Sequence, residues 1–330
     1  MNVGGESFAV VFSSDDRGVQ PLGVALFSLL DAAALGTVYK IFILSNGITE
    51  ANQARLRGLA AGRNVRHSVI FVDVSELEVM RGLPSNARWP IATWARIFIP
   101  DLLPDEHGVV LYADIDLLFC RDLTELFHTP LEGKAIGVVL EHVSHEGSHF
   151  NERLAIPQTA PGYFNAGVML MDLEIFRRQD LVRHILAYAD ANREKLTCLD
   201  QDALNGALAE NLQRLHPKWN WHDGLTRQLL RRSLHSKSVR GSSLQQAVEA
   251  ALHPGILHYQ GPNKPWHYSY RLERKRYEAA MQASGFGIYP LPGRSFMKWL
   301  KRRVYAPIYW LTWLQILRFD RHFRRMQTHG

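Results

Sequence analysis

Short apolar runs that end in polar residues recur along the first part of the chain and predict its fold. Such runs occupy residues 8–12, 38–44 and 65–72, and helical patterns of apolar residues lie between them at 22–33 and 51–61. Strands that alternate with helices in this way form a parallel sheet with right-handed crossovers. The pattern therefore predicts an α/β fold of the nucleotide-binding type.

The rest of the chain continues this alternation, with longer irregular stretches. We expect a short helix around 93–98, strands at 135–140, 168–171 and 256–259, and amphipathic helices at 181–191 and 199–209. Residues 146–162 have mixed polar, Pro and Gly character without clear periodicity. They are predicted to form a long loop near the functional site.

The run from Val109 to Phe119, VVLYADIDLLF, places two carboxylates after a predicted buried strand. Val109 to Tyr112 form the strand, and Asp114 and Asp116 follow it one residue apart. Acidic side chains beside a buried strand are costly unless something positive lies between them. Turn or cap chemistry is the alternative explanation, but the carboxyl end of a strand is where α/β sheets bind ligands. We therefore predict a divalent metal here.

Two further polar groups have one structural and one functional interpretation each. Arg96 lies among apolar neighbours, so it forms either a stabilising salt bridge or a phosphate contact. Asp200, Gln201 and Asp202 open a predicted helix, which indicates either N-cap chemistry or catalysis.

Further along the chain, a histidine and two tryptophans also have either a structural or a functional interpretation. His258 ends a short strand, where it is either a hydrogen-bonded structural residue or a third metal ligand beside the Gly-rich turn that holds Lys264. Trp219 and Trp221 lie in a predicted loop, where they stack on a sugar or fill a gap. The sequence leaves these alternatives open.

Composition indicates a globular protein. The 330 residues are 46% hydrophobic, enough for one large domain or a domain with an appendage. Cys120 and Cys198 are too few for a disulfide framework or a thiolate zinc site, so a reducing cytosol is expected. The first residues lack the basic start and long apolar core of a signal peptide, so secretion is not expected.

The basic charge of the chain lies in its last part. Residues 294–330 contain nine Lys or Arg and one Asp, whereas the whole chain has a net charge of +6. The longest uncharged run there, 304–317, has 14 residues and contains Pro307, too short for a bilayer span. Aromatic residues interleaved with basic ones predict an anchor that lies on an anionic membrane surface. A packed pair of helices and a nucleic-acid patch are the alternatives.

Six ordered motifs make the sequence resemble the retaining glycosyltransferases of family 8, which include bacterial lipooligosaccharide galactosyl- and glucosyltransferases and eukaryotic glycogenin. The motifs are SSDD (13–16), TWAR (93–96), YADIDLL (112–118), FNAGVMLMDL (164–173), LDQDALN (199–205) and HYQGPNKPW (258–266). The resemblance implies a GT-A nucleotide-diphospho-sugar transferase fold, with a mixed, mostly parallel sheet flanked by helices. It places a catalytic domain at 1–270 and a basic, aromatic helical region for membrane association at 271–330.

By this resemblance, Asp114, Asp116 and His258 bind Mn²⁺, with Mg²⁺ as the alternative ion, and the metal grips the diphosphate of a UDP-sugar. Carboxylates and imidazole suit such an ion. The remaining donor contacts implied are Asp15 for uracil or ribose, Gly261 and Lys264 for the diphosphate, and Arg96, Asn165, Gly167, Asp200 and Gln201 for the sugar.

Retention at the anomeric carbon is expected to proceed by front-face attack within a tight ion pair. Gln201 matches the family position near the face of the donor sugar that lies opposite the leaving group, and an amide is a poor nucleophile. In this scheme the departing phosphate takes the proton of the acceptor hydroxyl. Asp202 is the second candidate, as a covalent nucleophile. Glu141 stands where relatives commonly place an Asp on the sugar hydroxyls, and Arg17 where bacterial relatives often have Asn. The donor is therefore left open between UDP-glucose and UDP-galactose.

The resemblance implies hexose transfer to a lipopolysaccharide core or another lipid-linked oligosaccharide, at the inner face of the cytoplasmic membrane and without nucleic acid. One alternative is a catalytically silent sugar-nucleotide or glycan-binding protein. The other is a haloacid-dehalogenase-like phosphatase, which expects Thr or Val where Leu118 stands.

Overall fold

The structure is a computed structural model in which the chain divides into two compact units. It describes residues 6–62, 67–77, 82–84, 91–105, 107–143, 149–230, 238–239, 242–269, 271, 273–288 and 290–328. The first unit comprises residues 1–19, 33–115 and 123–215, and the second comprises 20–32, 116–122 and 216–330. The predicted domain boundary near residue 270 falls inside the second unit, and the division into a catalytic domain and a C-terminal region stays a prediction.

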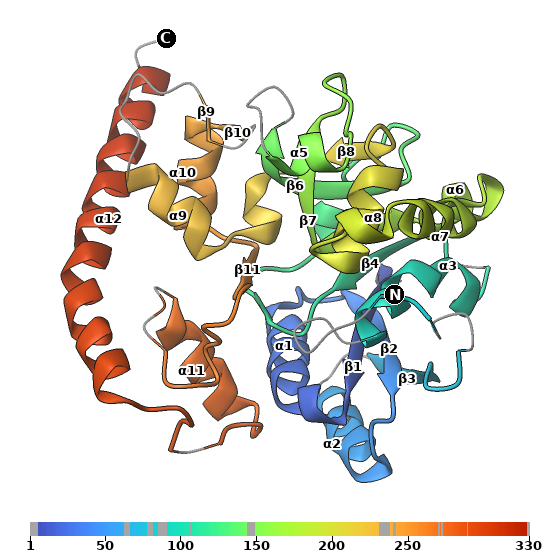
Figure 1. Cartoon of the computed structure of the whole chain (residues 1–330). Coiled ribbons are helices and arrows are strands. Elements are labelled where there is room, and N and C mark those ends of the chain that lie inside the picture. Colours follow the sequence, from blue (N-terminus) through green and yellow to red (C-terminus); the bar gives the residue numbers. More distant parts are fainter. Residues whose placement is uncertain are drawn as a thin grey trace. The chain divides into compact units, whose positions relative to one another are not determined.

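The first unit is built on a seven-stranded sheet with the order β3-β2-β1-β4-β7-β6-β8 (Figure 1). Its strands are β1 (Ser7–Asp15), β2 (Val38–Asn46), β3 (Ser68–Asp73), β4 (Val109–Ala113), β6 (Ile136–Val143), β7 (Gly162–Asp172) and β8 (Leu212–Arg214). The pairs formed among β1 to β4, and the pair of β6 with β8, are parallel, whereas β7 runs antiparallel to β4 and β6. The predicted mixed, mostly parallel α/β sheet is confirmed.

Four helices of the first unit, at 50–61, 91–98, 181–191 and 199–207, lie where the apolar periodicity predicted helices. The helices described in this unit are η1 (Asp16–Gly18), α2 (Glu50–Ala61), η3 (Ile91–Phe98), α3 (Ile99–Leu102), α4 (Thr124–Phe127), α5 (His149–Arg153), α6 (Leu173–Arg178), α7 (Leu181–Ala191), η5 (Arg193–Lys195) and α8 (Leu199–Ala207). The prediction that 146–162 is a loop was wrong in part, because α5 and the start of β7 lie there. Residues 144–148 are outside the described part.

Strand β7 is longer than the sequence pattern predicted. It begins at Gly162, so Asn165 and Gly167 lie inside the strand and not just before it. The strand lies between β4 and β6, and its first ten residues are buried, which removes the polar alternation that marks a half-exposed strand. Its pairing with β6 shifts register on both sides of Leu140.

The second unit is mainly helical around a two-stranded antiparallel pair, β5 (Leu117–Phe119) with β11 (Ile256–His258). Its other elements are α1 (Val19–Ala32), whose first residue belongs to the first unit, η6 (Pro217–Asn220), α9 (Asp223–Leu230), β9 (Ser238–Val239), β10 (Ser242–Ser243), α10 (Leu244–Leu252), α11 (Arg274–Ala283) and α12 (Phe296–Thr328). Trp219 and Trp221 are 2% and 3% exposed, and Trp221 Nε1 donates to Thr226 Oγ1 at 3.0 Å. The gap-filling interpretation of these tryptophans is the one observed.

The basic C-terminal segment forms one long helix, α12, that packs on its own unit. Ile316 and Phe319 are buried, and Arg302 pairs with Glu278 of α11 at 2.7 Å. In the helices that the structure describes, no stretch is long and apolar enough to cross a membrane.

Candidate active site

Asp114 lies directly after β4 in the first unit and is held from three directions. Its backbone N–H donates to the Gly167 carbonyl at 2.8 Å, which ties it to β7. Its Oδ1 accepts from the Tyr112 hydroxyl at 2.7 Å and lies 3.1 Å from Arg96 Nη2. A single carboxylate oxygen thus takes both contacts, and the position of the side chain is well defined.

Arg96, on η3, connects the end of β4 with the start of α8. It is 7% exposed, and its Nε lies 3.0 Å from Asp200 Oδ2 while Nη1 donates to the Ala166 carbonyl at 2.9 Å. Its guanidinium also lies 4.5 Å from the centroid of the Tyr112 ring, a cation–π contact. The salt-bridge interpretation is therefore observed, with one buried cation between Asp114 and Asp200.

Asp200, at the start of α8, is a buried carboxyl with a shifted pKa. Burial raises its pKa to about 6, the nearby Arg96 acts in the opposite direction, and the charge of Asp114 raises it further. The carboxylate therefore changes protonation state just below neutral pH. Such a group at the carboxyl end of a sheet is a functional-site candidate.

Gln201, the next residue, has both ends of its amide fixed. Its Oε1 accepts from the backbone N–H of Ala166 at 3.1 Å and from Asn165 Nδ2 at 3.3 Å. Its Nε2 donates to the Tyr163 hydroxyl at 2.8 Å. Asn165 in turn accepts from the backbone N–H of Gly167 at 3.0 Å. The predicted donor-sugar residues Asn165, Gly167 and Gln201 thus form one hydrogen-bonded group.

Asp202 is fully buried and is paired with Arg153 of α5 through two bonds of 2.9 and 3.0 Å. Its Oδ2 also accepts from the backbone N–H groups of Thr197 and Cys198, at 2.6 and 2.7 Å. Burial by itself would raise its pKa, but these bonds, led by those from Arg153, hold the pKa below its usual range. Asp202 therefore binds backbone donors just before α8, and its predicted catalytic role stays a prediction.

The end of β1 places Asp15 and Asp16 in different surroundings. Asp15 accepts from the backbone N–H of Gly18 at 3.0 Å and pairs with the exposed Arg17 at 2.7 Å. Asp16 instead accepts from the backbone N–H and the hydroxyl of Thr49. Asp16 therefore joins η1 to the start of α2. Asp15 instead pairs with Arg17, the residue that stands where bacterial relatives often have Asn.

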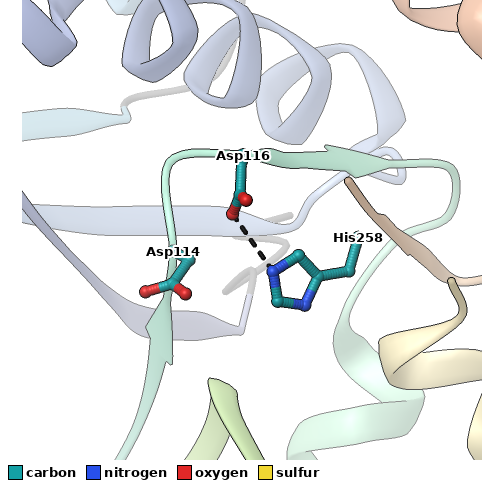
Figure 2. A group of neighbouring side chains, drawn as sticks. All are labelled: Asp114, Asp116 and His258. Carbon is teal, nitrogen blue, oxygen red and sulfur yellow. Dashed lines mark ion pairs between the residues drawn. The ribbon is translucent and has the colours of Figure 1, made fainter. Parts of the chain in front are cut away.

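In the second unit, Asp116 lies at the centre of a buried charged group. His258 Nε2 lies 3.1 Å from Asp116 Oδ1 (Figure 2). The Lys264 ammonium binds Oδ2 of the same carboxylate. Burial alone would raise the pKa of Asp116, but Lys264 and His258 hold it well below its usual range. The Tyr259 backbone N–H donates to the Asp116 carbonyl at 2.9 Å, which fixes β11 beside this residue.

The side chain of Asn220 sets the orientation of the His258 ring. Asn220 Oδ1 lies 2.8 Å from Nδ1, and both residues are buried. A proton on Nδ1 then leaves the lone pair of Nε2 directed toward Asp116. Two acceptors that face each other at 3.1 Å require a proton or a cation between them. The chemistry of this donor set fits a divalent metal ion.

Arg271, which no sequence motif singled out, shapes the turn after β11. Gly261 has a φ of +81°, a conformation that glycine adopts readily. Arg271 is 6% exposed and donates to the backbone carbonyls of Gln260 and Asn263, which flank Gly261 in the chain. The turn that carries Lys264 is therefore held in shape from within the second unit.

The structure distributes the predicted site residues between the two units. In the first unit it brings together Arg96, Asp114, Asn165, Gly167, Asp200, Gln201 and Asp202, and in the second unit Asp116, His258 and Lys264, with Gly261 on the same turn. Asp15 at the end of β1 and Glu141 within β6 belong to the first unit, at other strands of the sheet. The two groups meet along the chain at 114–116.

Sequence reasoning missed several residues that position these groups. Asn205 is one of them: it accepts from the Phe164 backbone N–H at 2.7 Å and donates to the Phe164 carbonyl at 2.9 Å, which joins α8 to β7. Its spacing of four residues from Gln201 places both on one face of the helix, a signal that was present in the sequence. Asn220 and Arg153 lie too far along the chain from their partners to be found in this way.

Comparison with known proteins identifies the family. The model of glycosyl transferase family 8 matches residues 9–269. The chain belongs to glycosyl transferase family 8. General stress protein A of Bacillus subtilis is 27% identical over 264 residues, which cover 79% of this chain and 88% of that protein. The lipopolysaccharide 1,3-galactosyltransferase of Salmonella typhimurium is 26% identical over 265 residues, or 79% of this chain and 74% of that protein.

A solved structure of the galactosyltransferase LgtC, in complex with donor and acceptor sugar analogues, also matches this family 8 chain. The TM-score is 0.72 at 26% identity, with 89% of this chain and all of that chain covered. This likeness confirms the predicted GT-A type of fold. Membership of family 8 does not favour the phosphatase alternative, because the matched region includes both the sheet and the predicted site.

Proposed function

We propose that this family 8 enzyme is a retaining hexosyltransferase that moves glucose or galactose from a UDP-sugar to a lipopolysaccharide core or a similar lipid-linked oligosaccharide. Several of its relatives are named for lipopolysaccharide galactosyl or glucosyl transfer. The observation that carries the proposal is the buried pair of Asp116 with His258, whose ring nitrogen faces the carboxylate. A carboxylate and an imidazole placed together can hold a divalent cation, which would bind the diphosphate of a UDP-sugar.

A divalent cation, Mn²⁺ or alternatively Mg²⁺, is proposed to bind Asp114, Asp116 and His258. These three residues form a candidate set of carboxylate and imidazole ligands. Asp116 and His258 are already paired, and Asp114 precedes Asp116 by two residues in the chain. When bound, the cation would neutralise the charge that develops on the UDP leaving group.

The remaining donor contacts proposed are those of the chain's own polar groups. Lys264 and the backbone at Gly261 bind the diphosphate, because an ammonium and exposed backbone N–H groups suit phosphate oxygens. Arg96, Asn165, Gly167, Asp200 and Glu141 face the sugar hydroxyls, and Asp15 faces the uracil or ribose. The network around Arg96 holds its carboxylates rigidly, so the donor sugar meets groups that are oriented before it arrives.

Retention is proposed to follow a front-face route in which Gln201 stabilises the sugar without attacking it. Both ends of the Gln201 amide are bound, so its position is fixed during the reaction. The acceptor hydroxyl attacks the face from which UDP departs, and its proton passes to the leaving phosphate. Arg153 binds both oxygens of Asp202, and backbone N–H groups bind its Oδ2, contacts that make it a poor nucleophile.

The test is transfer from a panel of UDP-sugars to a lipopolysaccharide core acceptor, with the product linkage determined by NMR. Transfer of one hexose with an α-linkage from an α-linked donor is expected. An inverted linkage would contradict the retaining mechanism. Metal-dependent binding of UDP-sugar without release or transfer would instead support the silent binding protein.

We further propose that α12 attaches the enzyme peripherally to the inner, cytoplasmic face of an anionic membrane. Ile316 and Phe319 face the protein, whereas apolar side chains elsewhere on the helix are exposed: Phe296, Met297, Leu300, Val304, Trp310, Leu311, Leu314 and Leu317. Exposed arginines and lysines flank them at Lys301, Arg303, Arg318, Arg321, Arg324 and Arg325. Exposed apolar rings and chains between basic groups suit the headgroup boundary.

Vesicle binding tests this attachment. Replacing Trp310 and Leu311 with Glu is expected to weaken binding to phosphatidylglycerol vesicles at least about tenfold, because it removes apolar burial and adds repulsion. Leu35→Glu, at an exposed leucine outside α12, is the matched control and is expected to bind as the wild type does. Equal binding by all three proteins would contradict the proposal.

A further inference from the structure

Tyr163, in β7, lies between the proposed catalytic amide and the buried ion pair of Asp202 with Arg153. Its hydroxyl donates to Asp202 Oδ1 at 2.8 Å and accepts from Gln201 Nε2 at the same distance. Tyr163 and Asp202 are both fully buried. A continuous chain of hydrogen bonds therefore runs from Arg153 to Gln201.

The direction of each bond in this chain follows from the chemistry of its ends. An ionised carboxylate can only accept, so the single hydroxyl proton of Tyr163 points to Asp202. The Tyr163 oxygen then faces Gln201 as an acceptor, and only the NH₂ end of an amide can satisfy it. The opposite end of the amide must be the oxygen, which is where the Ala166 backbone N–H donates to it at 3.1 Å.

The charge state of both partners supports this polarity. Burial and the charge of Asp202 raise the pKa of Tyr163 well above its usual range, so the phenol keeps its proton. Arg153 donates to both oxygens of Asp202, which keeps the carboxylate ionised and immobile. Reversing the amide would set its NH₂ against the Ala166 N–H, and its oxygen against the Tyr163 oxygen.

We propose that Tyr163 and Asp202 are positioning residues that fix which end of the Gln201 amide faces the donor sugar. Asp202 thus acts through Tyr163 and does not attack the sugar. This inference rests on the proposed function, because it assigns a purpose to the orientation of Gln201 during hexose transfer. A misplaced amide leaves donor binding largely intact but fails to stabilise the reacting centre.

Three variants separate positioning from a merely structural role. Tyr163→Phe removes the hydroxyl and keeps the ring, and it should lower kcat on the order of tenfold with the donor KM changed less than about twofold. Asp202→Asn presents an NH₂ group to the Tyr163 oxygen, so the hydroxyl proton turns to Gln201 and the amide reverses. This variant should lose more kcat than Tyr163→Phe, and adding Tyr163→Phe to it should not lower kcat further.

Tyr188→Phe is the matched control. The Tyr188 hydroxyl donates to the Leu154 carbonyl at 2.9 Å, so its proton is not part of the hydrogen-bond chain from Arg153 to Gln201. Its removal should leave kcat and KM unchanged even if the melting temperature falls as much as in Tyr163→Phe.

The outcomes distinguish this inference from the proposed function. Full kcat in folded Tyr163→Phe, with an active wild type, would overturn the positioning role alone. Equal losses of kcat in Tyr163→Phe and Tyr188→Phe would also overturn it, because they would show a general effect of lost stability. A wild type that binds UDP-sugars but transfers none would refute the proposed function. The amide orientation of Gln201 in a crystal structure of Asp202→Asn would then still test the hydrogen-bond chain. An unreversed amide would refute the positioning inference.

Discussion

Arg96 Nε lies 3.0 Å from Asp200 Oδ2, and both side chains are buried. Arg96 also serves Asp114, so one cation is shared between two carboxylates. Burial outweighs this attraction for Asp200, whose pKa rises to about 6. The pair therefore places a titrating group at the proposed sugar site, where its charge affects both activity and stability.

Activity is expected to fall when the pH drops below about 6, because protonation of Asp200 removes the negative charge that pairs with Arg96 and that is proposed to meet the sugar hydroxyls. One proton on one essential group gives a decrease of about tenfold in kcat/KM per pH unit on the acid side. The profile of kcat/KM between pH 5 and 8 measures this. A flat profile across that range would show that ionised Asp200 is not required.

Asp200→Asn is expected to inactivate the enzyme while making its stability less sensitive to pH. A carboxyl whose pKa is raised from 3.8 to about 6 contributes stability below the lower value and loses it as the pH rises through the higher one. The free energy of unfolding of the wild type should therefore fall, relative to the variant, by up to about 3 kcal/mol between pH 4 and 7. Urea unfolding at both pH values measures this. Parallel pH dependences in the two proteins would contradict it.

Arg96→Ala is expected to destabilise the first unit as well as to abolish transfer. Removing the cation leaves the buried carboxylate of Asp200 without its partner, at a cost of about 3–5 kcal/mol in the free energy of unfolding. Adding Asp200→Asn should restore part of this loss, because it removes the unpaired charge. A double variant that is no more stable than Arg96→Ala would show that the two side chains are not energetically coupled.

Asn220→Ala is expected to weaken metal binding without removing any proposed ligand. Asn220 Oδ1 contacts Nδ1 of His258 and so orients the opposite ring nitrogen, Nε2, toward Asp116. Loss of such a partner commonly weakens metal affinity by about 10–100-fold. Titration of UDP binding with Mn²⁺ measures the effect. Asn192→Ala, which removes an amide bonded to the Tyr188 carbonyl in the first unit, is the control and should titrate as the wild type does. Unchanged affinity in Asn220→Ala would rule out this role.

Arg271→Ala is expected to raise the donor KM about tenfold with a smaller effect on kcat. Arg271 holds the carbonyls of Gln260 and Asn263, and without it the turn must be ordered when the diphosphate binds. Steady-state kinetics with the preferred UDP-sugar measure both constants. A lower kcat at constant KM would show instead that the turn acts in the chemical step.

Much of the fold followed from local patterns in the sequence. The apolar runs of β1, β2 and β4 and the periodicity of α7 depend on neighbouring residues, so their positions were predicted within a few residues. The start of β7 was not predicted, because a strand buried on both faces loses the alternation that marks an edge or surface strand.

Only the site residues that lie close together in the sequence, within a motif, could be predicted. Asp114 and Asp116 are close in the chain and follow a strand, which local reasoning can recognise. Tyr163 and Arg153 act on residues 38 to 49 positions away, and no periodicity in the sequence links such pairs. The role of Asp202 also depended on these distant partners, so the sequence alone left it open between a cap and a nucleophile.

The most direct test of the account is UDP release from a panel of UDP-sugars with Mn²⁺ present and then chelated, compared between the wild type and Asp116→Ala. We predict metal-dependent release from one UDP-hexose by the wild type, and none by Asp116→Ala even though its circular dichroism spectrum is unchanged. Release that continues after chelation, or at an undiminished rate in Asp116→Ala, would contradict a metal-dependent transferase centred on this carboxylate.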